Sequence, residues 1–175
     1  MKLTPNFSLE EFIKVTPTDY QRYLLTLLAK NLQIVRDKLQ PFALNKSKAV
    51  SMSITSGVRT QDDYNRLVKQ GYNPSKKSDH FCGVQLDGNV TLGAADVVVN
   101  NCSLSLKDCV KKIIEWDKTN QVNFGQVIYE YNPATKKDWI HLGNDWNEVF
   151  KDSSFVSRKK YLMSLDNGKT YVDFK

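Results

Sequence analysis

The chain has 175 residues, of which 41% are hydrophobic and 11% aromatic, enough for one globular domain and too few for two separate cores. It carries 25 Lys and Arg against 19 Asp and Glu, a charged share that excludes disordered, collagenous and membrane-embedded classes. No apolar stretch is long enough to span a bilayer, so we expect no membrane span. The net charge of +6 suits an anionic partner such as nucleic acid, a membrane surface or an acidic polymer.

The N-terminal segment and the cysteines bear on the compartment. Residues 1–6 contain one lysine and no hydrophobic h-region, so we expect synthesis in the cytoplasm without a signal peptide. Cys82, Cys102 and Cys109 are odd in number and include no Cys-x-x-Cys pair. This pattern excludes a disulfide framework and a cysteine-rich zinc knuckle, and it leaves at least one thiol free.

The first half of the chain predicts mainly helices. Capping-box patterns, in which a hydroxyl precedes a carboxylate or amide by three residues, begin at Ser8, Thr18 and Thr60. After the second of these, leucines recur at helical spacing until Pro41, which predicts one long core helix. A further helix is expected over residues 105–117.

The second half of the chain predicts mainly strands. Single strands are expected at residues 49–55, 94–99, 125–131 and 139–142, and hairpins at 81–86 with 89–99 and at 161–165 with 169–174. Because helices come first and most strands later, the predicted class is α+β. We expect a single domain over residues 1–175, with helices packed on a small antiparallel sheet.

The chain contains only two histidines, His80 and His141, which are 61 residues apart. This separation excludes the helical His-Glu-x-x-His zinc motif, so a shared metal site would have to be assembled by the fold. A lone histidine is more often a hydrogen-bonded structural residue than a ligand. A catalytic zinc site needs three protein ligands and an open fourth position, and an aspartate is an acceptable third ligand.

Four short motifs surround these histidines. In chain order they are Ser56-Gly57-Val58-Arg59, Ser78-x-His80-x-x-Gly83, Gly93-Ala94-Ala95-Asp96 and Asp138-Trp139-Ile140-His141. Together they resemble the D-alanyl-D-alanine carboxypeptidase and L-alanyl-D-glutamate endopeptidase superfamily, peptidase family M15, over about residues 6–143. Residues 6–12 and 31–36 are similar to the phage and bacterial branch that cuts peptidoglycan peptides. Residues 144–175 lie outside the resemblance and are expected to form a C-terminal hairpin extension.

The resemblance implies that His80, an aspartate and His141 bind Zn2+. Asp87 has the family spacing of seven residues after His80, whereas Asp96 requires an insertion within residues 84–93. We favour Asp96, because Asp87 precedes a glycine and is well explained as a turn former. Three valines follow Asp96 and should anchor it in the sheet, where a ligand is held rigidly.

The resemblance places the catalytic base at Asp138, three residues before His141. In a regular strand these two side chains would point to opposite faces, so we expect Asp138 to lie at the irregular end of the preceding loop. Glu130 is the reserve candidate for the base.

Three further residues are expected to act on substrate. The resemblance gives Arg59 a role in binding substrate or transition-state oxygen, which suits a guanidinium, and we expect Ser78 and Trp139 to contact substrate. The implied activity is zinc-dependent hydrolysis of an amide bond in peptidoglycan stem peptides, of the L-Ala–D-Glu or D-Ala–D-Ala type. The enzyme would be a phage lysin or virion-associated protein acting at the bacterial cell wall.

The alternative is a non-catalytic wall-binding or structural phage component that retains the peptidase fold. The sequence has no helix-turn-helix, zinc-finger or RNA-binding signature, so we do not expect nucleic acid as a partner. It leaves open which bond is cleaved and the oligomeric state.

Overall fold

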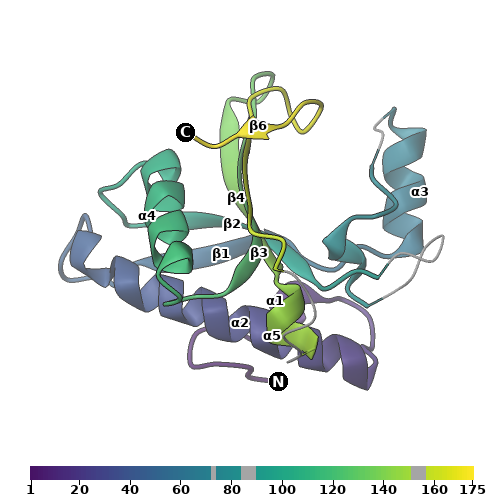
Figure 1. The fold of residues 1–175 in the computed structure, drawn as a ribbon, viewed down its shortest axis with the longest axis horizontal. Helices are drawn as coiled ribbons and strands as arrows, with labels where there is room; N and C mark the ends of the chain where they lie inside the picture. Colours follow the sequence, from purple (N-terminus) through teal and green to yellow (C-terminus); the bar gives the residue numbers. More distant parts are fainter. Residues whose placement is uncertain (72–73, 84–89, 151–156) are drawn as a thin grey trace.

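The computed structural model describes residues 1–71, 74–83, 90–150 and 157–175 (Figure 1). Its strands are β1 (Ser51–Ser56), β2 (Ala94–Asn100), β3 (Phe124–Asn132), β4 (Lys137–Asn144), β5 (Lys160–Ser164) and β6 (Val172–Asp173). Its helices are α1 (Leu9–Phe12), α2 (Asp19–Leu39), α3 (Gln61–Lys69), α4 (Leu106–Lys118) and α5 (Trp146–Phe150), with 3-10 turns η1 (Gln40–Phe42) and η2 (Asp79–Phe81).

Helices α1 to α4 each begin directly after a residue with a capping hydroxyl. Capping boxes precede α1 at Ser8, α2 at Thr18 and α3 at Thr60, and the Ser105 side chain accepts a hydrogen bond from the first turn of α4. Helix α5 was not predicted from the sequence. Phe81 was expected to open a hairpin but lies in η2, and the expected turn at Asp87 is outside the described residues.

The sheet is mixed and has the order β1-β2-β4-β3-β5-β6. Four of its five pairings are antiparallel, including the predicted C-terminal hairpin of β5 and β6, whereas β3 and β5 are parallel. The predicted antiparallel sheet is therefore wrong at this pairing. β4 ends where β5 begins, because Gly143 near the end of β4 and Lys160 at the start of β5 both pair with Gln126. β5 therefore runs in the direction opposite to β4 and parallel to β3.

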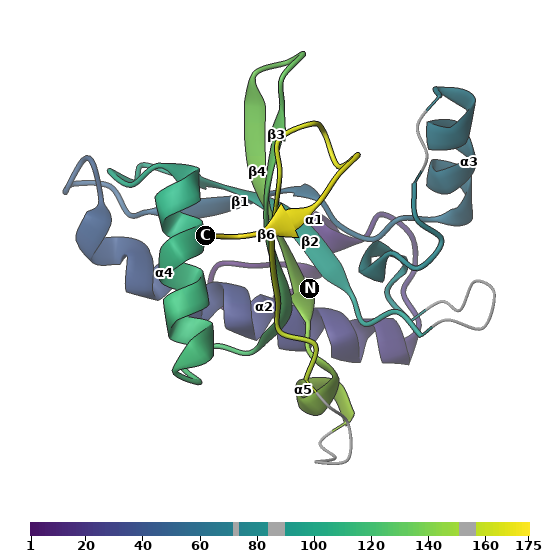
Figure 2. The same ribbon diagram turned by 45° about the horizontal axis from the view of Figure 1, so that its top comes forward.

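One face of the sheet carries the hydrophobic core. Leucines of α2 and apolar residues of α4 pack there against alternate strand residues; the cluster includes Leu24, Leu28, Leu32, Ile113, Val97, Val127, Ile140 and Leu142. In Figures 1 and 2, α4 and α3 lie on opposite sides of β3 and β4. No helix in the described ranges is long and apolar enough to cross a membrane. The opposite face of the sheet carries polar residues.

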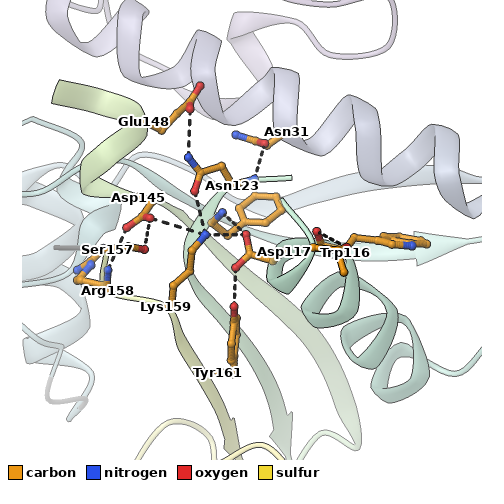
Figure 3. A network of polar contacts seen from close by, with 12 residues as sticks. Asn31, Trp116, Asp117, Asn123, Asp145, Glu148, Ser157, Arg158, Lys159 and Tyr161 are labelled. Atoms are coloured by element: carbon orange, nitrogen blue, oxygen red, sulfur yellow. Dashed lines mark hydrogen bonds and ion pairs between the residues drawn. The ribbon is translucent and has the colours of Figure 1, made fainter. Parts of the chain in front are cut away.

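A buried polar network joins the C-terminal segment to the core (Figure 3). The Asp117 carboxylate at the end of α4 accepts hydrogen bonds from Phe124 N at 2.8 Å, Lys159 Nζ at 3.0 Å and Tyr161 Oη at 2.8 Å. Lys159 Nζ also donates to Asn123 Oδ1 at 2.9 Å. The predicted C-terminal extension is thus held against α4 and contributes two strands to the common sheet.

Candidate metal centre

Strand pairing and one 3-10 turn bring three candidate ligands together. Asp96 on β2 lies directly opposite His141 on β4, so both side chains share one face of the sheet, and His80 reaches them from η2. Asp96 Oδ1 lies 3.2 Å from His80 Nε2 and 3.0 Å from His141 Nδ1, and the two ring nitrogens are 3.2 Å apart. This buried cluster can hold a metal ion.

The outer ring nitrogens fix the orientation of both imidazoles. His80 Nδ1 lies 2.7 Å from the Gly57 carbonyl oxygen, and His141 Nε2 lies 3.3 Å from Gln126 Oε1. Both partners can accept a hydrogen bond, so a neutral imidazole that donates from its outer nitrogen presents a lone pair on its inner nitrogen to a bound cation. Two imidazole lone pairs and a carboxylate facing one another form a donor set that calls for a cation.

The segment that follows β1, residues 57–59, holds His80 in place. Val58 N donates to the Phe12 carbonyl oxygen at 2.6 Å, and a Cβ on Gly57 would lie only 2.1 Å from that same oxygen. Only glycine allows this close approach, which aims the Gly57 carbonyl at the His80 ring. Arg59 N donates to the His80 carbonyl oxygen at 2.8 Å, so this segment holds His80 through both its ring and its backbone.

The cluster keeps its aspartate anionic. Burial alone would raise the pKa of Asp96, but the adjacent His80 and His141 outweigh this effect and hold it well below its usual range. Burial likewise opposes a charged His141, yet the hydrogen bond that the protonated ring donates to Asp96 raises the pKa of His141 above its ordinary value. A negative ligand is therefore available at neutral pH.

The cluster lines a cavity of about 990 Å³. Of the residues expected from the sequence, Arg59, Ser78 and Trp139 line it as well. The Ser78 hydroxyl accepts a hydrogen bond from His80 N at 3.4 Å and so caps η2. The alternative ligand Asp87 lies outside the residues that the structure describes.

Asp138 does not lie where the sequence analysis expected it. β4 begins at Lys137 and pairs with β3 in regular register through Asp138, so there is no irregular loop end at this position. The alternation along β4 places Asp138 on the face opposite His141, where it accepts a hydrogen bond from Tyr129 Oη at 3.0 Å. It is not among the cavity-lining residues.

Glu130, the reserve candidate, does line the cavity. It pairs with Trp139 while Ile128 pairs with His141, so Glu130 and His141 are diagonal neighbours on one face of the sheet. The residue is 8% exposed. Burial raises the pKa of Glu130, and the nearby His141 partly offsets this effect.

Gln126 was not predicted as a site residue, although its side-chain oxygen lies 3.3 Å from His141 Nε2. It precedes Ile128 and Glu130 at strand spacing and so shares their face of the sheet.

Replacing Gln126 by alanine should weaken the affinity for a divalent metal by about 10- to 100-fold, because the His141 ring loses the acceptor that orients it. Titration of the metal-free protein with Zn2+ measures this change. Gln61→Ala, on α3 and outside the cavity lining, is the control. Equal affinity in both variants would contradict the orienting role.

A scan against protein-family models, a search of the curated proteins and a search of the solved structures each gave no match.

Proposed function

We propose that the protein is a Zn2+-dependent peptidase that hydrolyses an amide bond in peptidoglycan stem peptides. The observation that carries this proposal is the convergence of His80, Asp96 and His141 in one cavity with Glu130, a carboxylate that the metal cluster does not include. The resemblance of the four motifs to peptidase family M15 supports the same activity. The substrate would place the site of action at the bacterial cell wall, as for a phage lysin or virion-associated enzyme.

The donor set fits zinc. Two neutral imidazole nitrogens and one carboxylate oxygen, from His80, His141 and Asp96, are ordinary zinc ligands, and three protein ligands would leave one position for water or substrate. When bound, Zn2+ would polarise the scissile carbonyl and lower the pKa of a water toward about 7.

Glu130 is suited to be the general base. Its carboxylate would accept a proton from the attacking water while the water oxygen bonds to the scissile carbonyl carbon. As the carbon–nitrogen bond breaks, the same group would return that proton to the leaving amine. Glu130 is then an ionised carboxylate again, as at the start of the turnover.

Arg59 is suited to stabilise negative charge on the substrate. Burial lowers the pKa of Arg59, and the negative charge of Asp96 opposes this shift. Arg59 lines the same cavity as the metal cluster. Lys77, Lys160 and Lys169 also line the cavity and give it a cationic rim. Such a rim attracts acidic wall peptides.

The test is digestion of purified peptidoglycan, with mass spectrometry of the released fragments. We expect amide cleavage that stops after treatment with EDTA and returns on addition of Zn2+. His141→Ala should remain inactive after Zn2+ is added, since it lacks a ligand. Zinc binding and wall binding without released peptides would instead favour the non-catalytic alternative, and failure of the chain to bind Zn2+ would refute the proposal.

A further inference from the structure

One wall of the cavity comes from the C-terminal segment, residues 157–175. Lys160 and Leu162 of β5 and Asn167, Lys169 and Tyr171 of the following hairpin line it. These residues lie beyond the part of the chain that resembles the peptidase family. The wall is therefore a feature of this chain that the resemblance does not account for.

Buried ion pairs fix this wall relative to the metal cluster. The Arg158 guanidinium pairs with the buried carboxylate of Asp79, the residue before His80, and Asp79 Oδ1 also accepts from Leu92 N at 3.0 Å. The next residue, Lys159, donates to Asp117 (Figure 3). The two residues before β5 are therefore held in place, Arg158 by Asp79 beside the metal cluster and Lys159 by Asp117 in the core.

The hairpin loop is organised by its own hydrogen bonds. Asp166 accepts from Ser164 Oγ at 2.9 Å, from Thr170 N at 2.9 Å and from the Thr170 hydroxyl at 2.6 Å. Asn167 N donates to the Tyr131 carbonyl oxygen at 3.0 Å, which ties the loop to the end of β3. The loop therefore holds the residues that follow it, including Tyr171, in a defined place.

The Tyr171 hydroxyl and the Glu130 carboxylate both lie close to Gly168. Its φ is 76°, and a Cβ built there would lie 3.0 Å from Tyr171 Oη and 3.3 Å from Glu130 Oε2. Burial raises the pKa of Tyr171 to about 12, with Glu130 and Asp96 adding to the effect and Arg59 opposing it. The phenol therefore keeps its proton at neutral pH, and Tyr171 lines the same cavity as Arg59, Asp96 and Glu130.

The Tyr171 hydroxyl has no acceptor among the residues that the structure describes. Within the part of the chain that the structure describes, no hydrogen bond engages it, whereas Tyr161 and Tyr129 donate to Asp117 and Asp138. A protonated hydroxyl in the lining of the cavity that also holds Arg59 is free to donate to a bound substrate.

We propose that Tyr171 is a further catalytic residue, whose hydroxyl donates a hydrogen bond to the scissile carbonyl oxygen as it acquires negative charge. This role rests on the proposed peptidase function. Tyr171 comes from the C-terminal hairpin and Arg59 from the segment after β1, so donors from two separate elements would meet the developing charge. No bond to Tyr171 forms or breaks.

The test compares Tyr171→Phe with Tyr131→Phe, which makes the same chemical change at a residue that does not line the cavity. We expect Tyr171→Phe to lower kcat by on the order of 10²-fold, with a much smaller change in KM, because the lost hydrogen bond forms mainly in the transition state. Zn2+ affinity and melting temperature should match those of the wild type. Tyr131→Phe should cleave at the wild-type rate.

A second measurement does not depend on turnover. The probe is the phosphinate analogue of D-alanyl-D-alanine, whose tetrahedral oxygens resemble the transition state, titrated into the zinc-loaded protein. Tyr171→Phe should bind it at least tenfold more weakly than the wild type and Tyr131→Phe do. Wild-type kcat and wild-type analogue affinity in Tyr171→Phe would overturn the role, as would a loss confined to KM. A wild-type protein that neither cleaves wall peptides nor binds the analogue would instead contradict the proposed function itself.

Discussion

Replacing Glu130 by glutamine is expected to lower kcat for wall-peptide cleavage by about 10²- to 10⁴-fold, the usual contribution of a general base. The amide has nearly the same shape as the carboxylate but cannot take a proton from water. Glu130 is not part of the His80, Asp96 and His141 cluster, so Zn2+ affinity should stay close to that of the wild type. Steady-state kinetics and Zn2+ titration of the same preparation separate the two effects.

The matched comparison is Asp138→Asn, because the sequence resemblance assigns the base to Asp138 and the structure turns it away from the cluster. An asparagine at this position keeps an oxygen that can accept the hydrogen bond from Tyr129 Oη. We therefore expect Asp138→Asn to retain most of the activity. If instead Asp138→Asn were inactive and Glu130→Gln fully active, the assignment based on the β3–β4 register would be wrong.

Local chemistry in the sequence was enough to predict most elements of the fold. The hydroxyl caps at Ser8, Thr18, Thr60 and Ser105 act within one helical turn, so they can be recognised without knowledge of tertiary contacts. The parallel pairing of β3 with β5 could not be predicted in this way. It joins residues more than 30 positions apart, such as Gln126 and Lys160, and depends on the path of the whole connection.

The candidate site was predictable only in part for the same reason. Two histidines and Asp96 could be proposed because short motifs mark them, and the structure brings them together. The choice between Glu130 and Asp138 depended on the register of the β3–β4 hairpin. An alternation was present in the sequence, since Gln126, Ile128 and Glu130 are spaced by two, but it shows which residues share a face and not which face holds the histidines.

The C-terminal wall could not have been predicted from local patterns. Asp79 and Arg158 are far apart in sequence, and from the sequence alone each would be expected to be an exposed charge on the surface. Only the fold pairs them and so places Tyr171 at the cavity. Charged residues that anchor one part of a chain to another are recognisable once their burial is known.

Replacing Asp117 by alanine should destabilise the protein by about 3–5 kcal/mol, the usual loss when one partner of a buried ion pair is removed. The Asp117 side chain is fully buried, and its removal leaves the Lys159 ammonium, the Phe124 N–H and the Tyr161 hydroxyl without their shared acceptor (Figure 3). A domain of this kind has only about 5–15 kcal/mol of total stability. The loss should therefore be plain in urea unfolding followed by tryptophan fluorescence.

The control is Asp108→Ala in the same helix, where the carboxylate is exposed and pairs with Lys111, so a far smaller change is expected. Lys159→Met added to Asp117→Ala should recover part of the loss, because it removes an ammonium whose remaining counter-ion, Asp145, lies 3.7 Å away. The double variant should thus be more stable than Asp117→Ala alone. If Asp117→Ala and Asp108→Ala unfolded at the same urea concentration as the wild type, Asp117 would not be the anchor of the C-terminal segment, and the position of β5 would have to be maintained by strand pairing and the Arg158–Asp79 ion pair.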